Sequence, residues 1–151
     1  MNAKENADVI IVDIAWGRDE RFGMTTSMEE MAYLAIDAGA SLVIGSNALG
    51  IYPMYEYKGV PIVYSTGYLI TDSDLTLARR SYIWKFNINK ENRVDRIDMI
   101  PICTENKTYT KDFRISNIDL CKDYNEMINS WNIENGLDST INEDDTITIK
   151  F

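Results

Sequence analysis

The sequence contains no histidine and only 2 cysteines among its 151 residues. Imidazole is a common ligand for transition metals and the usual base that activates a serine or cysteine nucleophile. The two cysteines, Cys103 and Cys121, form neither the paired spacing of a zinc site nor a disulfide framework. We expect two free buried thiols, with a single disulfide as the alternative if the chain works outside the cell.

Positive charge and long apolar runs are also scarce. The 15 basic residues are outnumbered by 24 acidic ones, so the net charge is −9 and a nucleic acid would approach against a repulsive field. We therefore expect no nucleic-acid partner. The longest N-terminal apolar stretch, Val9 to Trp16, is interrupted by Asp13 and is far shorter than the roughly 20 residues that span a bilayer. It also lacks the preceding basic region of a secretory signal. As it stands the chain would be cytoplasmic, whereas a fragment of an anchored parent would act at the cell surface.

The rest of the composition, 45% hydrophobic and 26% charged, is that of an ordinary globular protein. The length suits one core, so we expect residues 1–151 to form a single domain. Val9 to Ile14 and Leu42 to Ile44 are short β-branched runs that predict two buried strands. The helix expected between them makes a βαβ unit, in which the two strands are parallel.

That helix is marked at both ends. Thr26 with Glu29, or Ser27 with Glu30, has the spacing of a capping box, and Gly39 stands where a C-terminal glycine belongs. The apolar residues of the helix repeat at helical spacing and predict its buried face: Met28, Met31, Leu34, Ala35 and Ala38.

Antiparallel hairpins are expected next. Lys58-Gly59 and Asn89 to Asn92 are turn signals. They separate four strand-like runs, 54–57, 61–64, 81–88 and 93–102. The pattern therefore predicts an α/β fold with a mixed sheet, a βαβ start followed by antiparallel hairpins.

The C-terminal part predicts one more helix and a strand. Six residues mark the apolar face of this helix: Leu120, Cys121, Tyr124, Met127, Ile128 and Trp131. Asn135-Gly136 would end the helix, and residues 147–151 alternate like a strand. We expect the Trp131 face to be core or interface.

Four segments of the first half follow one another in the order and spacing of a known family. Ala7 to Gly17 is similar to a family strand ending in His-Trp-Gly, and Ile36 to Gly45 to a segment followed by a Gly-His-His-Pro-His type loop. Tyr57 to Ser65 continues the similarity, and Thr66 to Ile70 stands where the family reads Leu-Gly-Asn-Phe. The chain thus resembles the CapA/PgsA-type poly-γ-glutamate capsule-synthesis family. The match is strongest over residues 7–105, and residues 106–151 are a divergent helix and strand.

The resemblance implies half of a calcineurin-like metallophosphoesterase αββα sandwich, in which two sheets pack between helices and metals sit at strand ends. The family's first metal ligands come from an N-terminal half with no counterpart in this chain. A half-domain would leave a sheet face or edge uncovered, which favours a homodimer or a partner subunit.

The positions where the family carries metal ligands have lost them. A two-metal phosphoesterase site needs imidazole and carboxylate ligands. Ala15 stands at the His of His-Trp-Gly, Ser46 and Leu49 stand in the His-rich loop, and Tyr68 replaces Asn. The candidate remnant of the site comprises Ala15, Trp16, Ser46, Asn47, Leu49 and Tyr68. We expect no catalytic residue, metal or cofactor there. The remnant either lines a pocket for a sugar or peptide-like ligand or is collapsed and packed.

Two other groups of polar residues have a functional and a plain interpretation. Asp13, Asp19 and Glu20 offer oxygens to Mg²⁺, or they are strand-end and loop surface. Arg79-Arg80 contacts an anionic polymer such as poly-γ-glutamate, or it is a salt-bridged turn.

The leading hypothesis is a non-catalytic CapA-like protein or fragment, an accessory or binding component linked to capsule or poly-γ-glutamate biosynthesis. Its partners would be an anionic polymer or the capsule-synthesis machinery. The alternative is a metallophosphoesterase-type hydrolase whose missing N-terminal half supplies the metal ligands. A structural remnant with no separate activity is a third hypothesis.

Overall fold

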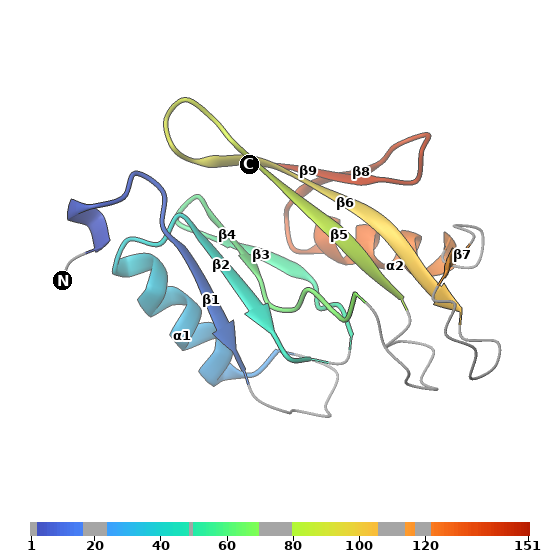
Figure 1. Ribbon diagram of the computed structural model, residues 1–151, viewed down its shortest axis with the longest axis horizontal. Helices are drawn as coiled ribbons and strands as arrows, with labels where there is room; N and C mark the ends of the chain where they lie inside the picture. Colours follow the sequence, from blue (N-terminus) through green and yellow to red (C-terminus); the bar gives the residue numbers. More distant parts are fainter. Residues whose placement is uncertain (1–2, 17–23, 49, 70–79, 106–113, 117–121) are drawn as a thin grey trace.

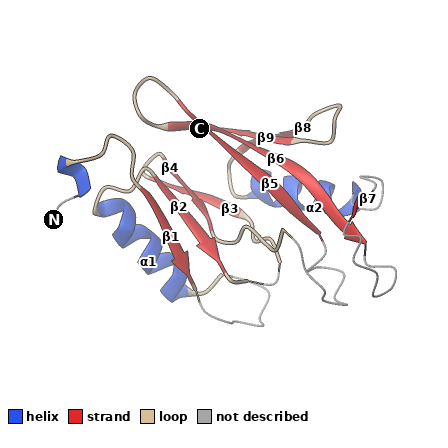
Figure 2. Cartoon of the chain, viewed as in Figure 1, coloured by secondary structure: helices blue, strands red, loops and turns tan. Residues whose placement is uncertain are grey.

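The computed structural model describes residues 3–16, 24–48, 50–69, 80–105, 114–116 and 122–151. Two sheets and two α-helices make up this part of the chain (Figures 1 and 2). After a 3-10 turn (Ala3–Glu5), the elements are β1 (Ile11–Ala15), α1 (Thr26–Asp37), β2 (Leu42–Ser46), β3 (Met54–Tyr57), β4 (Val60–Val63), β5 (Arg80–Ile88), β6 (Val94–Glu105), β7 (Arg114–Ser116), α2 (Lys122–Glu134), β8 (Asp138–Ile141) and β9 (Ile147–Lys150). The predicted α/β class with a mixed sheet is confirmed. No helix in these ranges is long and apolar enough to cross a membrane.

The first sheet has the strand order β1-β2-β4-β3. β1, β2 and β4 are parallel, and β3 pairs antiparallel with β4. The predicted βαβ unit and the hairpin at Lys58-Gly59 are both confirmed. Lys58 and Gly59 have φ values of 53° and 75°, which suit a two-residue hairpin turn that matches the twist of its strands.

The second sheet is antiparallel at every described pairing, with the order β5-β6-β9-β8 and with β7 also paired to β6. The predicted hairpin at Asn89 to Asn92 joins β5 to β6. Asn89 fixes this turn, because its side-chain oxygen accepts hydrogen bonds from the backbone N–H groups of Glu91 and Arg93.

The first sheet lies between two hydrophobic clusters. One face packs on α1 through Val43, Ile62 and Tyr64, and the other packs on the second sheet and α2 through Leu42, Met54 and Val63. Successive side chains on β2 and β4 therefore enter different cores, as expected for strands that are covered on both faces. α2 joins the second cluster through Tyr124 and Ile128, with Met127 and Trp131 packed against it. The core prediction for the Trp131 face is thus confirmed.

Two details of α1 differ from the prediction. The N-cap is Thr25, whose Oγ1 accepts from the Met28 N–H at 3.3 Å, so both predicted capping boxes are wrong. Glu29 instead accepts a hydrogen bond from the Tyr33 hydroxyl at 2.7 Å.

The buried face of α1 is also rotated from the predicted one. It comprises Met28, Ala32 and Ile36, whereas Met31 and Leu34 are 49% and 69% exposed. The C-terminal prediction is confirmed, because Gly39 has a φ of +109° directly after the C-cap Ala38.

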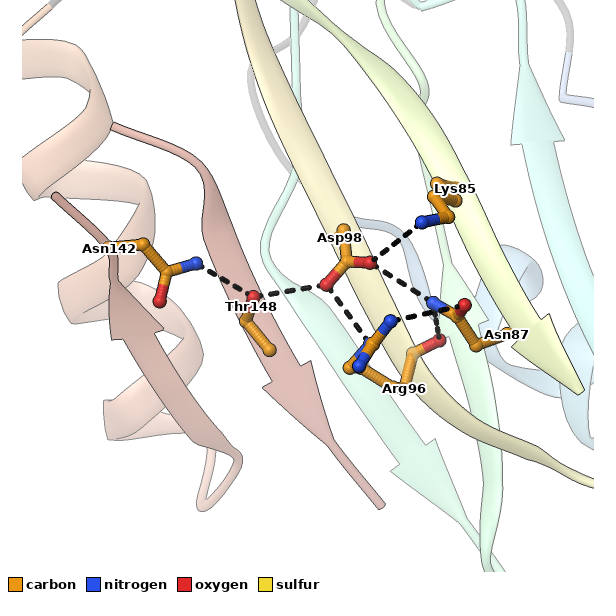
Figure 3. A network of polar contacts seen from close by, with 6 residues as sticks. All are labelled: Lys85, Asn87, Arg96, Asp98, Asn142 and Thr148. Atoms are coloured by element: carbon orange, nitrogen blue, oxygen red, sulfur yellow. Dashed lines mark hydrogen bonds and ion pairs between the residues drawn. The ribbon is translucent and has the colours of Figure 1, made fainter. Parts of the chain in front are cut away.

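The outer face of the second sheet carries a polar network centred on Asp98 (Figure 3). Asp98 accepts hydrogen bonds from Thr148 at 3.0 Å and Asn87 at 3.1 Å, and its Oδ1 lies 3.3 Å from Nε of Arg96. Lys85 adds a looser contact at 3.9 Å. The network links β5, β6 and β9 across this face.

Candidate functional site

The candidate residues gather where the parallel strands β1 and β2 end. Ala15 and Ser46 are register partners at these ends, and the Trp16 N–H donates to the Ser46 carbonyl at 3.3 Å. Asn47 follows directly, exposed and with a φ of 70°. The structure therefore brings together four of the six predicted residues. Ligands of α/β proteins commonly bind at such carboxyl ends of parallel strands.

The other two predicted residues are not joined to this group. Tyr68 is half-buried after β4, and no hydrogen bond links its described atoms to the four residues above. Leu49 lies outside the described residues, as do Asp19 and Glu20.

The side chain of Trp16 fills the space above Gly45 on β2. A Cβ atom on Gly45 would lie 1.8 Å from Nε1 of Trp16 and 2.1 Å from the carbonyl oxygen of Tyr64. Nε1 donates to that carbonyl at 2.8 Å, and the ring centroids of Trp16 and Tyr64 are 6.0 Å apart. The indole is thus seated on the sheet and hydrogen-bonded there, which leaves it no free donor to offer a ligand.

The segment after β2 is tied to the rest of the fold by Ser65. This buried hydroxyl donates to the Gly50 carbonyl at 2.5 Å and accepts from the Gly67 N–H at 3.2 Å. An isolated β-bridge pairs Ile51 with Thr66, and the Ile51 N–H donates to the Tyr124 hydroxyl at 3.4 Å. Ser65 therefore acts as a structural hydrogen-bonding group, because both of its contacts hold backbone.

The donors at the site do not suit a two-metal centre. Ser46, Asn47 and Tyr68 offer neutral oxygens, whereas such centres are held by imidazole and carboxylate groups. Within the described ranges, no three His, Cys, Asp or Glu side chains are close enough together to hold a metal ion. Asp13 is exposed on β1 and belongs to no such group in the described ranges.

The cluster between α1 and the first sheet includes Tyr33, Tyr55 and Tyr64. Burial raises the pKa of Tyr64, and nearby Tyr33, Glu29 and Tyr55 raise it further. The pKa of Tyr33 is raised to about 12, chiefly by its hydrogen bond to Glu29 and then by burial. Both tyrosines are therefore neutral at physiological pH.

Sequence reasoning missed Gly45 and Ser65, which decide how the site is packed. A glycine inside a buried strand is the one sequence signal that could have revealed the close approach of Trp16. Arg80 has a structural contact as well: its guanidinium lies 5.4 Å from the ring centroid of Tyr124, in a cation–π interaction. Arg79 and Cys121 lie outside the described residues, and Cys103 lies in β6.

Known proteins resemble this chain mainly over its first part. A family described as "Bacterial capsule synthesis protein PGA_cap" matches residues 1–73. The "PGA biosynthesis protein CapA" of Bacillus subtilis (strain 168) is 29% identical over 100 residues, which are 66% of this chain and 26% of that protein. The "Capsule biosynthesis protein CapA" of Bacillus anthracis is 26% identical over 99 residues, 66% of this chain and 24% of that protein. The chain spans about a quarter of the length of these curated relatives. Over the segment that carries the match, the chain is therefore similar to the CapA-type capsule synthesis family.

Proposed function

We propose that this chain is a non-catalytic CapA-like component of capsule or poly-γ-glutamate biosynthesis, built on half of a metallophosphoesterase-like sandwich. The observation that carries the proposal is the chemistry at the strand ends, where Ala15 stands at the position of the family's histidine and offers no group that could bind a metal. The neutral donors of Ser46, Asn47 and Tyr68 support the same conclusion. In this proposal the chain is an accessory or binding component that presents a surface to a partner and catalyses no reaction.

The test is metal content and phosphodiesterase activity. The chain is purified without chelators, its metal is measured by plasma mass spectrometry, and hydrolysis of bis-p-nitrophenyl phosphate is assayed with added Mn²⁺. Substoichiometric metal and no turnover are expected. Stoichiometric metal with turnover that Asp13→Asn abolishes would overturn the proposal in favour of a hydrolase whose remaining ligands come from another segment.

An assembly role is supported by the uncovered edge of the first sheet. β1 pairs only with β2 in the described part of the chain, and Ile11 on it is 51% exposed. α1, which runs alongside β1 in Figure 1, exposes Met31 and Leu34. Parallel strands are normally covered on both faces, and open apolar edges favour pairing with another chain. We therefore propose a homodimer or a partner subunit at this edge.

A further inference from the structure

The contact between α2 and the first sheet includes an asparagine that is followed by a glycine. Asn135-Gly136 lies directly after α2 and is the one Asn-Gly pair in the sequence. Asn135 is half-buried, whereas Gly136 is exposed. Gly136 has a φ of +83°, and no described atom lies within 4 Å of a Cβ atom built on it. The peptide nitrogen of a glycine is open to the preceding side chain, because the glycine has no side chain of its own to shield it.

The chemistry that such a pair allows is a ring closure followed by hydrolysis. The backbone nitrogen of Gly136 attacks Cγ of Asn135, and the side-chain nitrogen leaves as ammonia together with the proton of the Gly136 amide. Water then opens the resulting succinimide at one of its two carbonyls. The product is aspartate, or isoaspartate where the main chain continues through the former side chain. Water is the only other reactant that this reaction needs.

In the fold, a hydrogen bond holds each of the two reacting groups. Nδ2 of Asn135 donates to the Met54 carbonyl at 3.0 Å, which keeps the side chain on the first residue of β3. The Gly136 N–H donates to the Ile133 carbonyl at 2.9 Å, so the attacking nitrogen is itself engaged. The ring therefore closes only after the last turn of α2 has opened.

Either product would weaken the contact that the asparagine makes. An ionised aspartate has no proton to donate, so its carboxylate would face the Met54 carbonyl as a second acceptor. The new negative charge would also lie at the C-terminal end of α2, where the helix dipole disfavours an anion. Isoaspartate would in addition lengthen the main chain by one carbon shortly before Leu137, which is buried and whose N–H donates to the Asn132 carbonyl at 3.0 Å.

We propose that Asn135 is a site of spontaneous deamidation, made reactive when the last turn of α2 frays, and that its conversion loosens the contact between α2 and the first sheet. Hydrolysis does not restore the amide, so the reaction sets a chemical lifetime for the folded chain. Helix ends open locally at a lower free energy than the whole fold does, so the reaction does not wait for global unfolding. The site is independent of the proposed capsule function.

The test compares the rate of deamidation in the folded and the unfolded full chain. Both samples are kept at mildly alkaline pH, one in buffer and one in guanidinium chloride, and conversion is followed by peptide mapping with mass spectrometry. Asn135 should convert in both samples, about tenfold or more slowly in the folded one, because two hydrogen bonds hold its reacting groups. Asn47 is the internal control: it is exposed but is followed by Ala48, so it should convert far more slowly than Asn135 in the unfolded sample.

A second measurement tests the effect of the product on stability. Asn135→Asp reproduces one product and should lower the folding equilibrium constant about tenfold in denaturant unfolding, through the lost hydrogen bond and the unfavourable dipole. Asn92→Asp adds the same charge on the exposed β5–β6 turn and should leave the unfolding midpoint unchanged.

Three results would overturn the proposal. One is an Asn135 that stays intact in the unfolded chain. Another is a rate in the folded sample that equals the unfolded rate, or that only matches the globally unfolded fraction, because fraying of α2 would then play no part. The third is an Asn135→Asp variant as stable as the wild type.

Discussion

The indole nitrogen of Trp16 lies 1.8 Å from the point where a Cβ atom on Gly45 would stand. The indole of Trp16 thus occupies the space at the end of β2 that a side chain at position 45 would fill. The hydrogen bond to the Tyr64 carbonyl keeps the indole there. The packing of the candidate site therefore depends on the absence of a side chain at Gly45.

Replacing Gly45 with alanine should strongly destabilise the fold. The new Cβ would meet both the indole and the backbone of Tyr64, whose carbonyl oxygen would be 2.1 Å away. Overpacking against backbone leads us to expect a loss of about 3 kcal/mol or more in the free energy of unfolding, measured by urea denaturation. Gly136→Ala is the control: its φ is +83° but nothing lies within 4 Å, so we expect only about 1–2 kcal/mol. Equal losses in the two variants would show that the indole is not seated as described.

Removing the carboxylate of Asp98 should weaken the second sheet. This side chain is 14% exposed and accepts from Thr148 and Asn87 while pairing with Arg96. Asp98→Ala leaves these partly buried donors without their acceptor, so we expect a loss of about 1–3 kcal/mol by thermal or urea unfolding. Asp95→Ala, exposed on the same strand, should change the stability by less than about 0.5 kcal/mol. If both variants cost the same, the network in Figure 3 contributes nothing measurable.

Alkaline titration should reveal the bond between Tyr33 and Glu29. The pKa of Tyr33 is raised from 10.0 to about 12, so the folded protein holds this proton more tightly than the unfolded chain does. The associated stability is complete below pH 10 and is lost as the pH rises from about 10 to about 12. Glu29→Gln should move one tyrosine toward a pKa of 10 in a tyrosinate absorbance titration, and Glu30→Gln should not. Identical titration curves for wild type and Glu29→Gln would contradict the assignment.

The β1 edge should control the oligomeric state. We expect the wild type to exceed the 17.3 kDa monomer mass in light scattering after size exclusion. Ile11→Lys and Leu34→Glu should each reduce the mass to that of a monomer, because each places a charge in the apolar edge. Ile133→Glu, equally exposed but on α2, is the control. A monomeric wild type at all concentrations would rule out the homodimer and leave the partner subunit.

Local signals predicted much of the fold. β-branched runs, turn residues and the glycine after α1 located most elements, because each depends on neighbouring residues. The strand β8 was not predicted, because its sequence, Asp138-Ser139-Thr140-Ile141, has little apolar character. Its place depends on contacts with neighbouring elements, such as the Ser139 hydroxyl donating to Asn129 of α2 at 2.7 Å and the pairing with β9. The buried face of α1 was misassigned because apolar residues at helical spacing occur on two adjacent faces of the helix. Only the position of the sheet decides that Ala32 is buried and Met31 is exposed.

The candidate site was predicted in its location but not in its packing. Ala15, Trp16, Ser46 and Asn47 come together because parallel strands end at one edge. The seat of the indole on Gly45 and the bond from Ser65 to Gly50 depend on how the chain returns through β4. Such contacts between distant segments leave little trace in composition or periodicity.

Two asparagines, Asn132 in α2 and Asn135 directly after it, hydrogen-bond the backbone of Met54. Asn132 accepts from its N–H at 3.2 Å, and Asn135 donates to its carbonyl at 3.0 Å. These bonds fasten the CapA-like segment to a helix that lies beyond the match, and the two parts share one buried cluster. The CapA-like part has its own cluster beneath α1 but shares the other face of its sheet with the later part, so we expect the chain to melt in one cooperative transition. We therefore expect that a fragment ending where the family match ends, at residue 73, would not fold on its own.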